Sequence, residues 1–171
     1  MKEIEGIQIL KSKKPGKKVA VFAGVHGNEV CGVKAFEEIL PNLKINRGIV
    51  YFALGNLRAI TDNVRQTELN LNRAFRPDNE LNDKDKVTYE YKRSRELMTI
   101  LDQCDYLLDI HSFSNIVGTP FIICEPKSFN VAKKMPFNLV SHGWNKLEPG
   151  GTDYYMNYLG KNSICVECGQ H

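Results

Sequence analysis

Two imidazoles and a carboxylate stand at spacings that suit a metal ion. His26 and Glu29 lie three residues apart, and His111 follows in the run Asp109-Ile110-His111-Ser112. Two histidines and one glutamate form the three-ligand set of a hydrolytic zinc site, which leaves a fourth position for water, whereas a structural zinc usually gains a fourth protein ligand. The sequence therefore predicts one zinc ion per chain, bound by His26, Glu29 and His111 in a catalytic site.

The setting of these residues favours the metal interpretation over a pair of core or capping histidines. His-x-x-Glu alone is a weak pattern, because residues three apart meet on many helix faces. Here it follows an apolar, β-prone run at residues 18–23 and precedes helical spacing at residues 29–40. His111 likewise ends an apolar run at residues 106–110. Both halves of the site are expected at the carboxyl ends of strands, where open α/β sheets bind their ligands.

Arginines supply a second kind of chemistry. The stretch at residues 64–75 contains Arg65, Arg73 and the asparagines of Asn-Leu-Asn-Arg, and it is too polar for a core segment. One arginine could bind a substrate carboxylate through paired hydrogen bonds, and the other could polarise a carbonyl or hold the oxyanion formed when water attacks it. The alternative is solvated loop charge.

Glu167 is the one carboxylate in an apolar strand at residues 163–169. A buried, unpaired glutamate is costly, so it requires a cation, a metal-bound water or a proton. A general base that takes a proton from water fits this requirement.

The elements that must position these residues follow from the hydrophobic pattern. We expect strands at residues 4–10, 18–23, 48–54, 106–110, 121–124 and 164–168, and helices at 29–40, 84–101, 128–134 and 153–159. Strands that alternate with helices imply an α/β fold with a mixed, mostly parallel sheet and helices on both faces. We also expect the first two strands to form a hairpin across a lysine-rich turn, and residues 56–79 to form a long functional loop.

Some nearby positions have open interpretations. Asp109 lies two residues before His111 on the same strand face, so it is either an acceptor for a ligand imidazole N–H or a strand-end charge that reaches solvent. Residues 148–152 either border the cleft or form a turn before a helix. His142, Trp144 and His171 receive no role, since lone residues of these types are more often packing or surface groups.

The order of these motifs resembles that of the zinc carboxypeptidase superfamily, specifically its succinylglutamate desuccinylase/aspartoacylase branch. The resemblance extends from about Val19 to Gly169 and rests on His-x-x-Glu, Asn-Leu-Asn-Arg, Asp-Ile-His-Ser and Glu-x-Gly. It implies a zinc carboxypeptidase-like fold and a role for each matching residue: metal binding by His26, Glu29 and His111, catalysis by Glu167, polarisation of the scissile carbonyl by Arg65, and substrate binding by Asn72 and Arg73.

Two departures from the family pattern limit what the resemblance implies. Aspartoacylases have a substrate-binding arginine ten residues before the catalytic glutamate, and this chain has Asn157 there, so we do not expect strict N-acetylaspartate specificity. The family usually continues into a C-terminal β-rich domain, which we expect to be absent from a chain that stops at His171. Both a truncated catalytic domain and a minimal form with a more open cleft fit this pattern.

Three functions follow from these observations. The leading hypothesis is a zinc-dependent deacylase that splits an N-acyl amino acid, a linear amide, into a carboxylate and an amine. A zinc carboxypeptidase or peptidoglycan-type peptidase is the second, since His111-Ser112-Phe113-Ser114 resembles the His-Ser-Tyr-Ser of those peptidases. A non-catalytic zinc- and carboxylate-binding module is the third, and Glu167 argues against it.

Composition sets the remaining bounds. With 171 residues and 42% hydrophobic content, the chain is expected to fold as one domain, 1–171. It has no apolar run of membrane-spanning length, and Met1-Lys-Glu-Ile-Glu lacks the core of a secretory signal. Five cysteines, an odd number, indicate reduced thiols and a cytoplasmic protein. Cys165 and Cys168 would face opposite sides of a strand, so they are not expected to chelate a metal together.

Charge argues against a nucleic-acid partner. The net charge is +3, but five lysines between residues 11 and 18 exceed it, so the rest of the chain is acidic. This cluster surrounds Pro15-Gly16, a turn pair, and lacks the interleaved aromatics of a nucleic-acid surface. The expected partner is therefore a small acyl amino acid, with no nucleic acid and no membrane, and nothing in the sequence indicates an oligomeric state.

Overall fold

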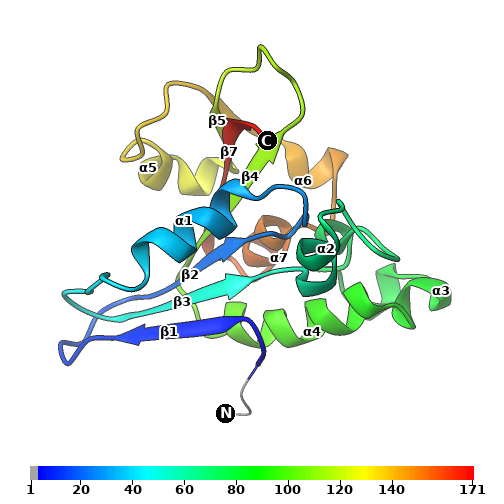
Figure 1. Ribbon diagram of the computed structural model, residues 1–171, viewed down its shortest axis with the longest axis horizontal. Helices are drawn as coiled ribbons and strands as arrows, with labels where there is room; N and C mark the ends of the chain where they lie inside the picture. The colour runs from blue at the N-terminus through cyan, green and yellow to red at the C-terminus, as the bar shows by residue number, and fades with distance from the viewer. Residues whose placement is uncertain (1–3) are drawn as a thin grey trace.

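The computed structural model describes residues 4–171. Within them, seven strands form one sheet in the order β1-β3-β2-β4-β7-β5-β6 (Figure 1). The first three residues, part of the segment expected to lack a secretory signal, lie outside the described residues. Within the sheet, β1 with β3 and β5 with β7 are antiparallel, and the other neighbours are parallel. The predicted mixed, mostly parallel sheet is confirmed.

The elements within residues 4–171 have the following bounds. The strands are β1 (Ile7–Lys11), β2 (Lys18–Ala23), β3 (Ile49–Leu54), β4 (Tyr106–Phe113), β5 (Phe121–Ile123), β6 (Val140–Ser141) and β7 (Asn162–Gln170). The helices are α1 (Cys31–Ile39), α2 (Leu57–Asp62), α3 (Asp83–Lys86), α4 (Tyr89–Leu101), α5 (Phe129–Ala132), α6 (Trp144–Leu147) and α7 (Thr152–Tyr158). Short 3₁₀ turns lie at Leu71–Arg73, Asp78–Glu80 and Pro126–Ser128. Among these helices none has the length and apolarity needed to cross a membrane.

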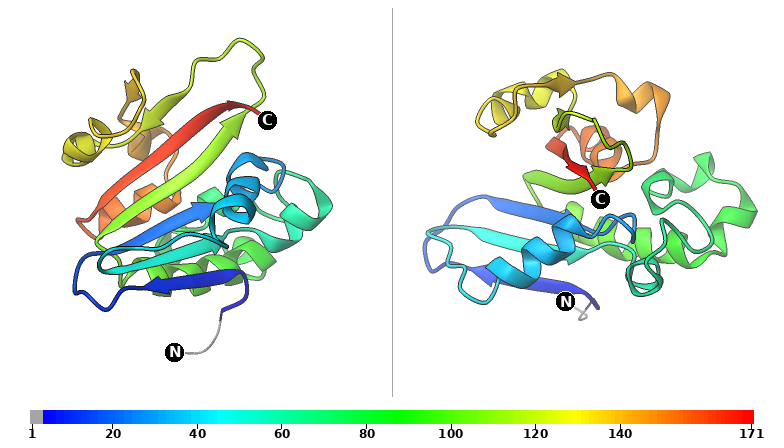
Figure 2. Two further views of the ribbon diagram at one scale, coloured as in Figure 1. Left: turned by 60° about the vertical axis from the view of Figure 1, so that its left-hand side comes forward. Right: turned by 45° about the horizontal axis from the view of Figure 1, so that its top comes forward.

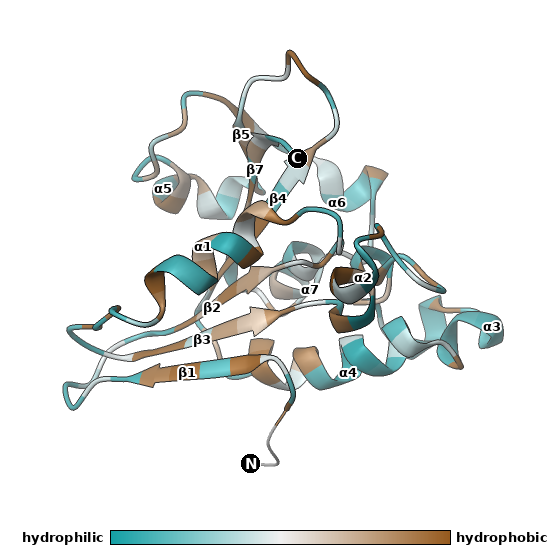
Figure 3. Ribbon diagram, viewed as in Figure 1, coloured by the Kyte–Doolittle hydropathy of each residue, from teal (hydrophilic) through white to brown (hydrophobic). Residues whose placement is uncertain are grey.

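Helices cover both faces of the sheet, as the alternating pattern predicted. On one face, Leu97 of α4 and Met156 of α7 pack against Phe22 of β2 in one cluster. The other face is covered by α1 and α5 (Figure 2). These two helices pack against hydrophobic clusters that share Ile110 of β4. A strand that is covered on both faces has a nearly continuous apolar sequence, and β2 and β3 are accordingly hydrophobic (Figure 3). Helix α3, by contrast, is hydrophilic.

The expected hairpin between the first two strands is wrong. β1 pairs antiparallel with β3, with Ile9 opposite Tyr51, and does not pair with β2. β2 is instead flanked on both sides by parallel partners, β3 and β4. β1 has exposed residues on much of its length, which suits the sheet edge better than the centre. The lysine turn between the two strands connects the edge strand to the sheet interior.

Two further expectations about local structure are wrong. Residues 56–79 are not one loop, because Asn56 caps α2 by accepting a hydrogen bond from the backbone N–H of Ala59 at 3.1 Å. The expected helix at residues 84–101 is two helices, because Thr88 caps α4 and separates it from α3. In both places a short polar side chain that accepts a backbone N–H ends the preceding segment and starts a new helix.

Candidate metal centre and cleft

The three predicted metal ligands converge at the carboxyl edge of the sheet. His26 and Glu29 lie in the turn from β2 to α1, and His111 lies near the end of β4, which is parallel to β2. The Nδ1 of His26 is 2.7 Å from Glu29 Oε1, and the Nδ1 of His111 is 2.8 Å from Glu29 Oε2. All three side chains are buried.

A close approach fixes the turn that carries His26 and Glu29. A Cβ atom added at Gly27 would lie 2.0 Å from the carbonyl carbon of Ala59 in α2. Only glycine allows this turn to pack against α2, which explains the residue between the two ligands.

The donor atoms fit a zinc ion. One atom each from His26, Glu29 and His111 lie within 4.8 Å of one another, and imidazole nitrogen with carboxylate oxygen is a donor set typical of hydrolytic zinc. Asp109, His111 and Cys165 form a second close group. In this second group Asp109 Oδ2 already accepts a hydrogen bond from the Thr152 hydroxyl, and burial raises the pKa of Cys165 well above its usual value, whereas the first group combines two imidazoles with a carboxylate. The first group is therefore the better metal centre.

The charges of these ligands depend on one another. Burial alone would raise the pKa of Glu29, but hydrogen bonds with His111 and His26 outweigh it and hold that pKa far below the usual range. Burial lowers the pKa of His26, so its imidazole favours the neutral form that binds metals. The arrangement thus supplies an ionised carboxylate between two imidazoles.

The second nitrogen of each imidazole also has a partner. Asp109 Oδ2 lies 3.0 Å from His111 Nε2 and accepts a hydrogen bond from the hydroxyl of Thr152. Asp109 is fully buried, so the interpretation of it as a strand-end charge that reaches solvent is wrong. On the other side, Asn70 Oδ1 lies 3.1 Å from His26 Nε2. The sequence reasoning missed Asn70, although it stands in the same Asn-Leu-Asn-Arg motif as Asn72.

Glu167 lies beside the candidate metal centre because β7 pairs with β4. The two strands are parallel, with Glu167 directly opposite His111 in the register. Its Oε2 atom is buried and has no hydrogen-bond partner within residues 4–171. Burial raises the pKa of this carboxyl group. A carboxylate in this position is poised to accept a proton.

A cavity of about 110 Å³ contains six of the seven predicted site residues. Those six are His26, Arg65, Asn72, Arg73, His111 and Glu167. Glu29 lies just beyond it and lines an adjoining cavity of about 330 Å³, together with His171. Residues that sequence reasoning did not assign also line the first cavity: Ile123, Trp144, Glu148, Gly151, Asp153 and Cys165. Residues 148–152 therefore do border the cleft.

Both arginines have acidic partners. Arg65 donates from NH1 to Glu29 Oε1 at 3.1 Å, and its side chain is half exposed. Arg73 forms an ion pair with Glu148 and donates to the backbone carbonyl of Asn72 at 2.7 Å. The Arg73–Glu148 pair could not be anticipated, since the two residues lie far apart in the sequence and Glu148 carries no motif.

Glu90 of α4 holds the segment that carries Arg65 and Asn70. Its buried carboxylate accepts hydrogen bonds from the backbone N–H groups of Thr67, Glu68 and Leu69, and from the side chains of Asn56 and Thr67. Burial alone would raise the pKa of Glu90, but these hydrogen bonds lower it. A single ionised group therefore orders the loop beside the metal centre.

The five cysteines all lie in the described part of the chain, and none of them forms a disulfide there. Cys165 is buried and Cys168 is exposed, so the two thiols face different environments. Cys168 instead contacts Cys31 at the start of α1, and this hydrogen bond lowers the pKa of Cys31 to about 6.

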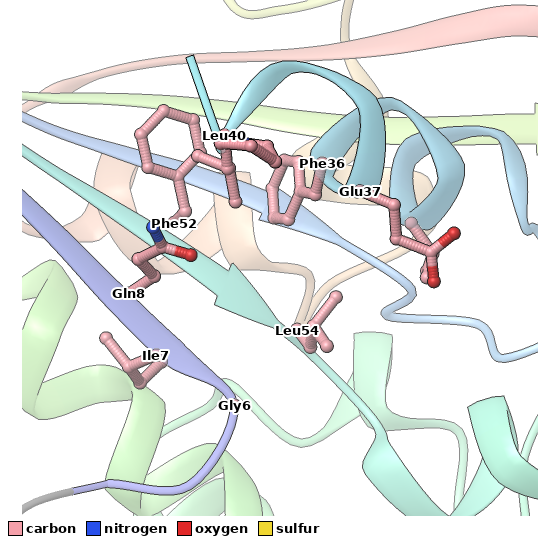
Figure 4. A pocket seen from close by; sticks show the side chains of 10 residues that line it. Gly6, Ile7, Gln8, Phe36, Glu37, Leu40, Phe52 and Leu54 are labelled. Atoms are coloured by element: carbon pink, nitrogen blue, oxygen red, sulfur yellow. The ribbon is translucent and has the colours of Figure 1, made fainter. Parts of the chain in front are cut away.

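A larger cavity, of about 470 Å³, lies between α1 and strands β1 and β3 (Figure 4). Its walls are mostly apolar, with Phe36, Leu40, Phe52 and Leu54 among them, and Glu37 is its titratable residue. Among the described residues, its lining offers none of the convergent polar groups that catalysis requires. The smaller cleft at the carboxyl edge is the candidate active site.

Comparisons with known proteins show which family the chain belongs to. Residues 15–171 match the family described as succinylglutamate desuccinylase/aspartoacylase catalytic domain. Aspartoacylase of Danio rerio is 30% identical over 122 residues, which cover 63% of this chain and 37% of that protein. N-acyl-aromatic-L-amino acid amidohydrolase (carboxylate-forming) of Mus musculus is 30% identical over 186 residues, which cover 92% of this chain and 54% of that protein. The chain thus spans about half or less of the length of these relatives.

Solved structures share the fold. Succinylglutamate desuccinylase from Chromobacterium violaceum superposes with a TM-score of 0.79 at 20% identity and covers 96% of this chain and 57% of its own. The tripeptide-bound cell shape determinant Csd4 from Helicobacter pylori gives a TM-score of 0.77 at 15% identity, over 95% of this chain and 49% of its own. At these identities the likeness concerns the architecture alone.

Proposed function

The chain belongs to the succinylglutamate desuccinylase/aspartoacylase family, and on that premise we propose that it is a zinc-dependent hydrolase that cleaves a linear amide bond. Its substrate is an N-acyl amino acid or a related small amide that carries a carboxylate. The names of the relatives, aspartoacylase and an N-acyl-aromatic-L-amino acid amidohydrolase, support this class. Asn157 lies on α7 at the position where the aspartoacylase pattern has a further substrate-binding arginine, so we do not expect strict N-acetylaspartate specificity.

One observation carries the proposal. Two imidazole nitrogens meet one buried carboxylate at the edge of the sheet, directly beside a glutamate whose Oε2 atom is buried without a partner among residues 4–171. Zinc bound by His26, Glu29 and His111 would supply Lewis acidity, which lowers the pKa of water and polarises a carbonyl oxygen. A metal centre next to a proton acceptor is the arrangement that metal-assisted hydrolysis requires.

Residues of the chain carry out proton transfer, stabilise the developing charge and bind the substrate. Glu167 accepts a proton from the attacking water at its carboxylate and returns it to the leaving amine, as a general base and then a general acid. Arg65 stabilises the carbonyl oxygen as negative charge develops on it. Asn72 and Arg73 bind the substrate carboxylate and keep the amide in register with Glu167. Trp144 and Ile123 supply the apolar part of the cleft wall.

Glu167→Gln tests this assignment. The amide side chain keeps the shape but cannot accept a proton, so turnover should fall by roughly two orders of magnitude or more, the size of a lost general base. Zinc content, measured by metal analysis, should stay at about one ion per chain, in line with three-ligand sites. Glu38→Gln, an exposed position on α1, is the matched control and should keep full turnover.

Assays of N-acyl amino acids and short peptides in parallel separate the alternatives. Faster turnover of short peptides than of N-acyl amino acids would show that the protein is a peptidase and not a deacylase. Bound zinc without turnover of any amide would favour the binding module. A Glu167→Gln variant with full activity would remove the proposed general base.

A further inference from the structure

The ion pair between Arg73 and Glu148 places two opposite charges side by side in the cleft. Both side chains line the cavity that contains Glu167 and the two metal-ligand histidines. The Arg73 side chain is 31% exposed and that of Glu148 is 45% exposed, so both can be reached by a substrate. An accessible ion pair contributes little stability, so its partners can exchange for groups of a ligand at small cost.

The backbone that carries Glu148 is fixed against the segment that carries Arg73. The carbonyl of Gly150 accepts a hydrogen bond from Phe75 N–H at 3.0 Å, and Asn72 Oδ1 accepts one from Thr152 N–H at 3.2 Å. Gly150 has φ of +99°, and a Cβ atom there would lie 2.5 Å from the carbonyl oxygen of Arg73. The segment 148–152 is therefore not a loose flap, and the Glu148 carboxylate stays near the mouth of the cleft.

This arrangement of charges favours some carboxylate-bearing substrates over others, according to the other charges that they carry. A substrate that offers only a carboxylate to Arg73 leaves its negative charge beside Glu148, with the buried Asp153 also lining the cleft. A substrate that also carries an ammonium group can satisfy both partners, with carboxylate on Arg73 and ammonium on Glu148. The α-carboxylate and α-ammonium of an amino acid are attached to one carbon, which matches an arginine and a glutamate in direct contact.

We propose that Glu148 is a specificity-determining residue and that the Arg73–Glu148 pair binds a zwitterionic amino-acid head. This inference rests on the proposed amide hydrolysis. Because the α-amine must remain free and charged, the acyl group that is removed sits on a side-chain amine, and the preferred substrates are ω-N-acyl diamino acids. Water adds to the acyl carbon, the bond from that carbon to the side-chain nitrogen breaks, and this nitrogen takes up a proton. The products are a carboxylic acid and the free diamino acid.

A pair of isomers tests the proposal. Nδ-acetylornithine keeps the zwitterionic head, whereas Nα-acetylornithine has the same atoms and net charge but an ammonium group far from its carboxylate. The zinc-loaded wild type should show a kcat/KM roughly two- to fivefold higher for the δ isomer, the ratio expected from one solvent-accessible charge pair. Glu148→Gln should bring the ratio close to one. Nγ-acetyldiaminobutyrate and Nε-acetyllysine vary the chain length between head and amide. Glu38→Gln should keep the wild-type ratio.

Binding makes the test independent of turnover. Calorimetric titration of both isomers into zinc-loaded Glu167→Gln, with and without Glu148→Gln, gives dissociation constants without hydrolysis. The δ isomer should bind more tightly, and only while Glu148 is present. A preference for the α isomer, or a ratio unchanged by Glu148→Gln, would overturn the proposal. Deacylation without an isomer preference contradicts the zwitterion inference alone, whereas selective binding without any turnover contradicts the proposed hydrolysis alone.

Discussion

At the scale of single residues, the direction of each side chain decides what the site can do. Both candidate ligand histidines turn Nδ1 toward Glu29, which leaves Nε2 for an outer partner. That partner is the carboxylate of Asp109 for His111 and the neutral amide of Asn70 for His26. A carboxylate raises the basicity of an imidazole more than an amide does, so we expect His111 to be the stronger metal ligand of the two.

Arg73→Lys tests the role of the guanidinium group. Lysine keeps the charge but loses the paired hydrogen bonds to a carboxylate, so the KM for substrates with a free carboxylate should rise by roughly tenfold. Substrates whose carboxylate is replaced by an amide should change little. Steady-state kinetics on both substrate types gives the comparison. Arg47→Lys is the control, because Arg47 donates a hydrogen bond to the carbonyl of Pro15 away from the cleft. Equal losses on both types would show that Arg73 does not bind the carboxylate.

Asp153 should make stability depend on pH. Burial raises its pKa from 3.8 to about 6, so the folded chain keeps a proton that the unfolded chain releases near its ordinary pKa. The contribution of Asp153 to the free energy of unfolding should therefore decrease as pH rises from about 4 to about 6, and Asp153→Asn should remove this contribution. The variant should be more stable by about 3 kcal/mol above that window and nearly equal below it.

Urea unfolding of metal-free protein across this pH range measures the effect. Metal-free protein is required because a bound cation would add its own charge to the cleft. A constant difference between Asp153→Asn and the wild type at every pH would mean that Asp153 is not the titrating group.

At the scale of elements, the site depends on a contact between helix α4 and the loop after α2. Glu90 receives its hydrogen bonds from backbone and side-chain groups of Thr67, Glu68, Leu69 and Asn56. The loop has no regular structure of its own between Asn63 and Asn70. Its order therefore comes from the ionised carboxylate on the neighbouring helix, and the positions of Arg65 and Asn70 depend on it.

Glu90→Gln should loosen this loop. Glutamine replaces one acceptor oxygen with an NH₂ group and removes the charge, so the free energy of unfolding should fall by roughly 2–3 kcal/mol, the cost of breaking buried hydrogen bonds to a charged group. Amide hydrogen exchange at residues 67–69 should become faster. Glu96→Gln on the same helix is the control, because its side chain is 56% exposed and should change stability by less than about 1 kcal/mol. Unchanged exchange at residues 67–69 would contradict this role.

At the scale of the whole molecule, three strands must assemble before the site exists. His26 follows β2, His111 lies on β4 and Glu167 lies on β7, and these strands are neighbours in the sheet. The unfolded chain does not hold these groups together, so a metal that binds them stabilises the folded state by mass action.

Zinc should therefore raise the free energy of unfolding. At a free zinc concentration about 1,000 times its dissociation constant the gain should be about 4 kcal/mol. Thermal unfolding of zinc-loaded and chelator-treated protein measures it. His26→Ala should lose both the bound zinc and the gain, whereas His142→Ala should keep both, because His142 packs against Phe129 away from the cleft. A full gain in His26→Ala would place the zinc elsewhere.

The family, the fold class and the convergence of the candidate site could be predicted from the amino-acid sequence. Each of these rests on local patterns: an apolar run that ends in His-x-x-Glu, another that ends in Asp-Ile-His, and a glutamate inside a third. Because the carboxyl ends of parallel strands meet at one edge, strand-end residues can be placed together without knowing the strand order.

The contacts between distant side chains could not be predicted from these local patterns. The pairing of β1 with β3, the contact of Asn70 with His26 and the ion pair of Arg73 with Glu148 join residues that are distant in the chain. Local hydrophobic pattern specifies an element and its buried face, but it does not specify the element's neighbours. Those contacts follow from how strands are ordered and how loops pack across the edge of the sheet, and the charge pattern of the cleft depends on them.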